Sequence, residues 1–174
     1  MEPADLEQRI AQLHPAAFAW ALACCRWDRA EAEEVLHSTY VRVLEGRARF
    51  GGRSSLKTWL FAVVRRVAAE TRRRRWFGES VLRRWREATP LDPVPTPDET
   101  VNAKERGARV RHALQQLAIR QREVLDLVFF HGLTIEEAAS VMGVALGTAR
   151  VHYQRGKRHL LVLLAAEGTN DAGR

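Results

Sequence analysis

The most constraining feature of this sequence is the stretch LTIEEAASVMGVALGTARVHYQRGKRHL, which occupies residues 133–160. Thr134 is followed three residues later by Glu137, a spacing that forms a capping box and predicts the start of a helix. Gly143 then supplies the permissive backbone of a helix-ending turn, and a second helix is expected from about Leu146. Two short helices joined by a tight turn form the helix-turn-helix pattern, whose second helix enters the DNA major groove.

The expected second helix has an apolar side and a polar, basic remainder. Its apolar side consists of Ala149, Tyr153, Gly156 and Leu160. Its candidate base-reading residues are Arg150, Val151 and Gln154, because arginine can pair with a guanine edge, glutamine with an adenine edge, and valine can touch a thymine methyl. Its candidate phosphate contacts, which position the helix without reading sequence, are Thr148, Arg155 and Arg158. A plain helical hairpin with a solvated basic face is the alternative for this stretch.

The segment before this stretch, residues 114–132, is predicted to form a helix that ends at Gly132. It should carry Leu125, Val128 and Phe129 toward a core. Together the two segments resemble region 4 of bacterial sigma factors. The residues that carry the resemblance are Leu114, Leu117, Arg120, Gln121, Arg122, Glu123, Val124, Gly132, Leu133, Thr134, Glu137, Ala138, Ala139, Gly143, Gly147, Thr148, Arg155 and Leu160.

The first half of the chain has the pattern of several amphipathic helices. A short helix over residues 5–13 is expected to stop where Pro15 disfavours helical geometry, and a new helix should begin at that proline. Asp28 and Glu31 have the spacing of a second capping box, which predicts a helix whose apolar stripe ends at Gly46.

A loop with the sequence FGGRSS, residues 50–55, precedes a long helix with apolar residues at helical spacing. Those residues are Leu56, Trp59, Leu60, Val63, Val64 and Val67. Arginines cover the surface and far end of the helix. This half resembles region 2 of the extracytoplasmic-function sigma factors, the smallest sigma factors. The residues that carry the resemblance are Ala32, Glu33, Tyr40, Arg42, Val43, Leu44, Phe50, Gly52, Arg53, Ser54, Ser55, Leu56, Thr58, Trp59, Leu60 and the closing arginines at residues 72–75.

The resemblance implies a protein that binds core RNA polymerase and directs it to promoter DNA, with an anti-sigma factor as its regulator. The residues implied to contact polymerase are Glu33, Glu34 and Arg42. The residues implied to form a pocket for an unstacked base of the minus-10 element are Phe50, Arg53, Ser54 and Ser55. The residues implied to hold the flanking phosphates are Lys57, Arg65 and Arg66. The second half is implied to recognise the minus-35 element.

The predicted fold class is all-α, with two small helical domains joined by a flexible linker and a helix-turn-helix in the C-terminal domain. The first domain is predicted over residues 1–87 and the second over residues 104–166. Residues 88–103 between them are acidic and rich in proline, and a proline-rich chain extends by about 3.1 Å per residue. Residues 167–174 are expected to form a disordered tail.

Composition limits the other classes of function. The net charge of +7 favours a polyanionic partner, either nucleic acid or an anionic membrane surface. No stretch approaches the roughly 18 apolar residues that span a bilayer, so no membrane insertion and a cytoplasmic location are expected. The adjacent Cys24 and Cys25 are expected to be small core residues. The histidines are scattered, so neither a metal site nor a cofactor is predicted.

The chain is not expected to be an enzyme, since no nucleophile with a base, ligand cluster or phosphate-binding glycine loop has usable spacing. One alternative is a polymerase-independent helix-turn-helix regulator that binds an operator as a dimer. A second is an RNA-binding or membrane-surface protein that uses the arginine run. A third is a nucleic-acid enzyme such as a recombinase, whose catalytic residues are missing.

Overall fold

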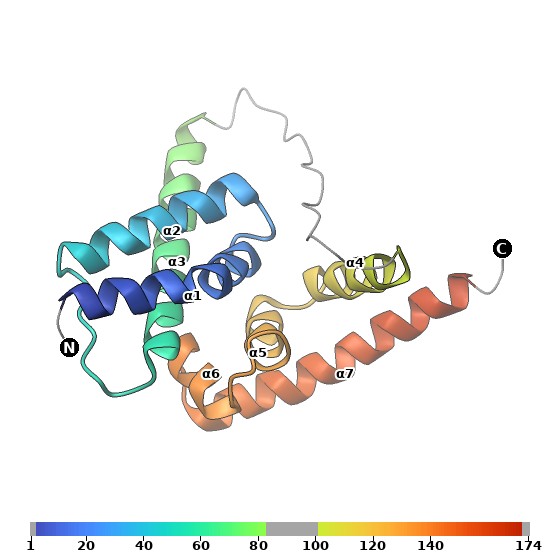
Figure 1. Cartoon of the computed structure of the whole chain (residues 1–174). Coiled ribbons are helices and arrows are strands. Elements are labelled where there is room, and N and C mark those ends of the chain that lie inside the picture. Colours follow the sequence, from blue (N-terminus) through green and yellow to red (C-terminus); the bar gives the residue numbers. More distant parts are fainter. Residues whose placement is uncertain (1–2, 83–100, 172–174) are drawn as a thin grey trace. The chain divides into compact units, whose positions relative to one another are not determined.

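The computed structural model describes residues 3–82 and 101–171, and Figure 1 shows the helices that they form. These are α1 (Pro3–Cys24), α2 (Arg29–Leu44), α3 (Leu56–Leu82), α4 (Val101–Gln115), α5 (Ile119–Phe129), α6 (Ile135–Met142) and α7 (Leu146–Asp171). The chain divides into two compact units, which contain α1–α3 and α4–α7. The predicted all-α class with two helical domains is therefore confirmed over the described residues.

The ends of the second unit differ from the sequence prediction. Residues 88–100 of the predicted linker lie outside the described residues, whereas residues 101–103 belong to α4. Helix α7 continues to Asp171, so residues 167–171 of the predicted tail are helical.

The core of the first unit lies where α3 crosses α1 and α2 (Figure 1). Trp20 of α1 and Phe61 of α3 are fully buried, with stacked rings whose centroids are 5.9 Å apart. The Trp20 indole Nε1 also donates a hydrogen bond of 3.0 Å to the Phe61 carbonyl oxygen. Phe61 lies outside the apolar stripe predicted for its helix. It is buried because α3 packs against two helices, which cover a wider arc than one neighbour would.

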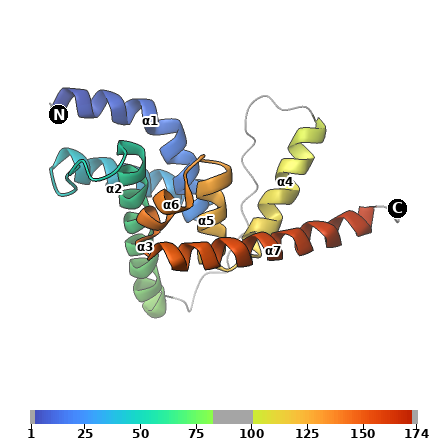
Figure 2. The same ribbon diagram turned by 90° about the horizontal axis from the view of Figure 1, so that it is seen from below.

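The predicted break at Pro15 is wrong. Helix α1 runs without interruption from Pro3 to Cys24 with Pro15 inside it, and Figure 2 shows its ribbon bending along its length. A proline within a helix removes one backbone donor and clashes with the carbonyl four residues earlier, which can bend a helix without ending it. Residues on both sides of the proline, among them Ile10 and Ala17, are buried, so packing holds both halves of α1 in place.

The turn between α1 and α2 is held by the backbone and by a side-chain cap. Arg26 and Trp27 have φ angles of 55° and 68°, in the left-handed region that non-glycine residues rarely enter. Asp28 caps α2 by accepting a 2.9 Å hydrogen bond from the Glu31 backbone N–H, which confirms the predicted helix start.

The two neighbouring cysteines lie at the end of α1 and in the turn that follows. Cys24 and Cys25 are free and buried, as the sequence predicted. Burial, reinforced by the nearby Glu31 carboxylate, raises the pKa of the Cys25 thiol to about 12. This thiol is therefore protonated at neutral pH.

The second unit contains a turn that the sequence analysis missed. The single helix predicted over residues 114–132 is wrong, because α4 ends at Gln115 and α5 begins at Ile119. The intervening residues include neither glycine nor proline, so no local signal marks the turn. Leu125 is buried as expected, but Phe129 is exposed and stacks on Tyr153 of α7, with centroids 6.0 Å apart.

Candidate nucleic-acid interface

The predicted pair of helices in the second unit is present with its capping interactions. The Glu137 backbone N–H donates to Thr134 Oγ1 at 3.1 Å, and the Thr134 backbone N–H donates to Glu137 Oε2 at 2.9 Å. Both halves of the capping box therefore start α6 where predicted. Gly143 ends the helix with a φ of 64°, and α7 begins at Leu146. This order of elements matches the helix-turn-helix prediction.

Helix α7 presents the two faces expected from its sequence. Ala149 and Gly156 are buried, and Tyr153 and Leu160 are half-buried against the unit. All the candidate DNA contacts on this helix are exposed: Thr148, Arg150, Val151, Gln154, Arg155 and Arg158. Within the described residues, the three arginines form no ion pair or hydrogen bond with another side chain. The helix therefore presents an open cationic face with the exposed side chain of Val151 on it.

Helix α5 supports both helices of this pair. The Arg120 guanidinium donates a 3.2 Å hydrogen bond to the Met142 carbonyl oxygen at the end of α6. The Gln121 side chain meets His159 of α7, with 3.2 Å between Oε1 and Nδ1. Sequence reasoning noted Arg120 and Gln121 only as part of a family pattern. Their role in bracing the two helices depends on contacts that no local pattern predicts.

The loop over residues 50–55 brings together some of the residues predicted for the minus-10 pocket. Phe50 is half-buried and packs its ring edge against Trp59, with centroids 5.4 Å apart. Arg53, three residues later, is exposed. Ser55 Oγ accepts a 3.1 Å hydrogen bond from the Thr58 backbone N–H and so caps α3. The Ser54 hydroxyl donates to the Ser55 carbonyl oxygen at 3.2 Å. Both serine hydroxyls thus already have local partners.

The predicted phosphate contacts of the first unit are spread around α3. The Lys57 ammonium lies 5.7 Å from the centroid of the Phe61 ring, and Arg65 is half-buried. Arg66 is exposed. Since residues on an α-helix are separated by about 100°, Arg66 lies on the side of α3 opposite to Lys57, whereas Arg65 is closer to it. One flat surface cannot contact Lys57 and Arg66 together.

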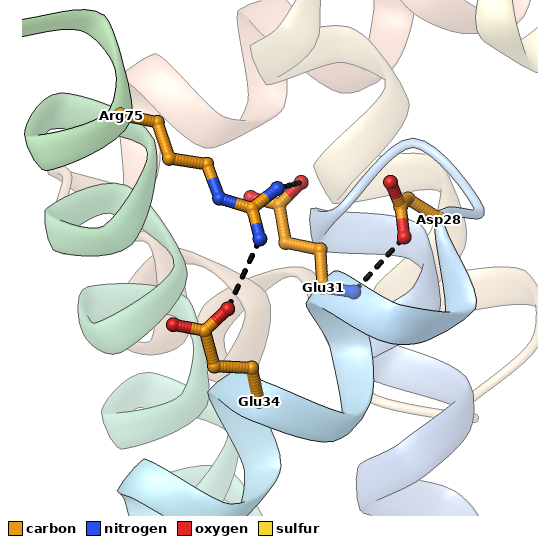
Figure 3. Close-up of polar contacts among 4 residues, drawn as sticks. All are labelled: Asp28, Glu31, Glu34 and Arg75. Carbon is orange, nitrogen blue, oxygen red and sulfur yellow. Dashed lines mark hydrogen bonds and ion pairs between the residues drawn. The ribbon is translucent and has the colours of Figure 1, made fainter. Parts of the chain in front are cut away.

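The predicted polymerase contacts on α2 all have intramolecular partners. Glu33 pairs with Arg29 at 2.8 Å, and Arg42 pairs with Glu70 of α3 at 2.7 Å. Glu34 pairs with Arg75 at 3.0 Å, and Figure 3 shows this arginine reaching from α3 to the start of α2.

The same arginine also approaches Glu31, with 3.4 Å between Nη1 and Oε2 (Figure 3). Burial raises the pKa of the Glu31 carboxyl, although Arg75 opposes the shift. In contrast, a hydrogen bond from Arg42 lowers the pKa of the Glu70 carboxyl. Arg42 with Glu70, and Arg75 with Glu31 and Glu34, therefore form ion pairs that join α2 to α3, whereas the pair of Arg29 with Glu33 lies within α2.

Comparison with known proteins places both units in one class. The family model for sigma-70 region 2 matches residues 10–77, and the model for sigma-70 region 4 matches residues 107–160. The chain is 32% identical over 141 residues to the ECF RNA polymerase sigma factor SigX of Bacillus subtilis, covering 76% of this chain and 70% of that protein. It is 31% identical over 142 residues to the ECF sigma factor SigC of Mycobacterium tuberculosis, covering 82% and 75%.

A solved structure is similar over nearly the whole chain. The sigma factor RpoE, in complex with the anti-sigma factor NepR from Bartonella quintana, has a TM-score of 0.73 and 25% identity, covering 92% of this chain and 97% of that chain. The two matching regions define a sigma factor. More narrowly, the chain belongs to the extracytoplasmic-function (ECF) sigma factors of RNA polymerase.

Sigma factors bind core RNA polymerase and promoter DNA and direct the initiation of transcription, and this function applies to the chain as a member of the family. The alternative of a polymerase-independent regulator is not favoured. None of the helices in the described parts of the chain is both long and apolar enough to cross a membrane.

Proposed function

We propose that α7 reads the minus-35 element of the promoter in the major groove, with Arg150, Val151 and Gln154 on the bases. The observation that carries this proposal is the open face of α7, where three arginines without partners among the described residues surround an exposed valine. Thr148, Arg155 and Arg158 contact phosphates. An arginine that pairs with a guanine through two hydrogen bonds contributes about 1–3 kcal/mol of discrimination.

Binding to a panel of duplexes with single-base changes in the minus-35 element tests this assignment. Arg150→Ala should relax the preference at one base pair by the factor that this energy implies, about 5-fold to 150-fold. Arg155→Ala is the matched control, since it removes the same charge from a phosphate contact. It should weaken all sequences alike and reduce the salt slope by about one. An Arg150→Ala protein with an unchanged preference profile would remove the support for this assignment.

We also propose two tasks for the first unit. The face of α2 with Glu33, Glu34 and Arg42 docks on core polymerase. The loop with Phe50, Arg53, Ser54 and Ser55 then holds an unstacked base of the minus-10 element. The edge-to-face contact of Phe50 with Trp59 supports this pocket, because aromatic planes can replace part of the stacking energy that a base loses on leaving the duplex. Lys57, Arg65 and Arg66 hold flanking phosphates of a strand that curves around α3.

One experiment with two sets of variants separates these tasks. The double variant Glu33→Lys, Glu34→Lys should lose association with core polymerase in gel filtration. The double variant Arg53→Ala, Ser54→Ala should keep that association but lose permanganate reactivity of the minus-10 thymines in the open complex. Docking would be misassigned if the first variant still bound polymerase. The pocket would be misassigned if the second variant melted the promoter normally.

We further propose that the chain has an anti-sigma partner, works in the cytoplasm with polymerase and catalyses no reaction of its own. The complex of the similar sigma factor RpoE with NepR supports such a partner. An anti-sigma factor should prevent the chain from joining core polymerase in a competition assay. A stable ternary complex that still initiates transcription would contradict this role.

A further inference from the structure

Gly156 lies in the middle of α7, where a glycine is unfavourable for a helix. Glycine gives up more conformational freedom than alanine when a helix forms, so a glycine inside a long helix needs a structural reason. The reason lies in α5. A Cβ atom added at Gly156 would stand 3.0 Å from Gln121 Cβ, 3.1 Å from Leu125 Cδ1 and 3.2 Å from the Gln121 carbonyl oxygen.

None of these three neighbours can move aside easily. The Gln121 carbonyl belongs to the backbone of α5, and its Cβ is fixed to that backbone. Leu125 is fully buried, so its side chain has little space into which it could turn. Any side chain at position 156 therefore pushes α7 away from α5 by a few tenths of an ångström.

The contact at Gly156 is one point of a longer brace between the two helices. Gln121 also meets His159, one turn further along α7. Arg120, its neighbour on α5, caps the end of α6 through the Met142 carbonyl oxygen. The same turn of α5 thus contacts the C-terminal end of α6 and the side of α7 that packs against it.

We infer that Gly156 is a positioning residue for promoter recognition: the lack of a side chain lets α7 lie against α5 at the separation that aims Arg150 and Gln154 at the bases. This inference rests on the proposed reading of the minus-35 element by α7. Arg150 lies six residues from Gly156, or about 9 Å along the helix axis. A displacement at Gly156 is therefore passed to Arg150 through a short, rigid stretch of helix.

The test is Gly156→Ala, measured on the same panel of minus-35 duplexes. Discrimination at the base pair read by Arg150 should fall on the order of threefold to tenfold, since paired hydrogen bonds depend steeply on geometry. Affinity for unrelated DNA and its salt slope should stay at the wild-type level, because phosphate contacts tolerate such shifts. A purely structural defect would lower the folded fraction and scale all affinities alike, leaving the preference ratios unchanged.

Gly147→Ala is the matched control for stability. Gly147 lies near the start of the same helix, and a Cβ there would meet nothing within 4 Å. The substitution Gly147→Ala should keep or raise the melting temperature of the protein, whereas Gly156→Ala should not raise it. If Gly156→Ala does not fold, the double variant with Leu125→Val, which removes the Cδ1 atom, provides a folded protein for the same comparison of ratios.

The possible outcomes distinguish a failure of this inference from a failure of the proposed reading of the minus-35 element by α7. A wild-type protein without any minus-35 preference would overturn the proposed reading by α7. A wild-type preference that Arg150→Ala relaxes but Gly156→Ala leaves intact would overturn only the positioning role. A flattened profile in Gly156→Ala, with normal binding to unrelated DNA, supports the inference.

Discussion

The charged side chains that are proposed to bind partners differ between the two units in whether they form intramolecular ion pairs. In the first unit, Glu34 is held by Arg75, and Arg42 is held by Glu70. In the second unit, Arg150 and Arg155 extend from α7 without an ion pair to any side chain that the structure describes. Binding at this face of α2 must therefore exchange existing ion pairs, whereas binding at the exposed face of α7 adds contacts to arginines that have no ion pair among the described residues.

This difference bears on how strongly each surface responds to salt. An exposed ion pair contributes only about 0.2–1 kcal/mol, so a partner of the first unit displaces such a pair at small cost. Arg155 and Arg158 of α7 are proposed to bind phosphates, and such contacts would release counterions from DNA, which makes affinity fall steeply with salt. We expect the face of α2 with Glu34 and Arg42 to favour a specific protein partner, and the exposed face of α7 to favour a polyanion.

The largest expected effect concerns the core beneath the ion pairs. Trp20→Ala should destabilise the first unit by about 3–5 kcal/mol, because it removes a fully buried indole and its stack on Phe61. Hydrogen exchange of the α1–α3 amides measures the effect. Trp20→Phe is the matched control: it keeps a ring but loses the hydrogen bond to the Phe61 carbonyl, and should cost less. Unchanged exchange in Trp20→Ala would show that this stack does not hold the helices together.

A medium effect is expected at the start of α6. Thr134→Ala should destabilise the second unit by about 1 kcal/mol, because the Glu137 backbone N–H loses its acceptor. Urea unfolding followed by circular dichroism measures the change. Ser140→Ala, on an exposed position of the same helix, should be nearly neutral. Equal effects of the two substitutions would mean that the capping box adds nothing to the helix pair.

The smallest effect concerns one of the ion pairs that join α2 and α3. Glu70→Gln should destabilise the first unit by less than about 1 kcal/mol near neutral pH, since the pair with Arg42 is only partly buried. The folded state lowers the pKa of the Glu70 carboxyl below its usual value of 4.5. The contribution is therefore present above that value and is lost as the pH falls through the lower, folded-state pKa.

Urea unfolding of the wild type and of Glu70→Gln across an acidic pH series measures this dependence. The two proteins should differ near neutral pH and converge in acid. A difference that grew as the pH fell would contradict the assigned direction of the shift. Glu45→Gln is the control, because the ion pair that Glu45 forms among the described residues is with the exposed Arg47, two residues away, and joins no second helix.

Sequence reasoning succeeded where a feature depends on residues close together in the chain. Local interactions define both ends of α6. The capping box of Thr134 and Glu137 starts the helix, and the left-handed backbone of Gly143 ends it. The exposed face of α7 follows from the same helical periodicity. The function was predicted from the resemblance to two sigma factor regions, because helical periodicity indicates structure and not function.

Sequence reasoning failed where contacts between distant residues decide the outcome. Packing of α1 kept the helix intact through Pro15. Asp126 and His131 are polar residues that lie buried with 3.2 Å between Oδ2 and Nε2, a contact that the sequence analysis did not anticipate. The partners of Glu34 and Arg42 lie on another helix, so the pairing of the proposed polymerase face could not be predicted locally.

The buried thiol at the turn after α1 offers a built-in probe of the first unit. With a pKa of about 12, the Cys25 thiol is ionised in only about one molecule in 10⁵ at neutral pH. Alkylating reagents attack the thiolate, so a folded molecule should react very slowly. Labelling of this cysteine would then proceed through transient opening of the helices around it. The labelling rate would therefore report how often the helices of the first unit open.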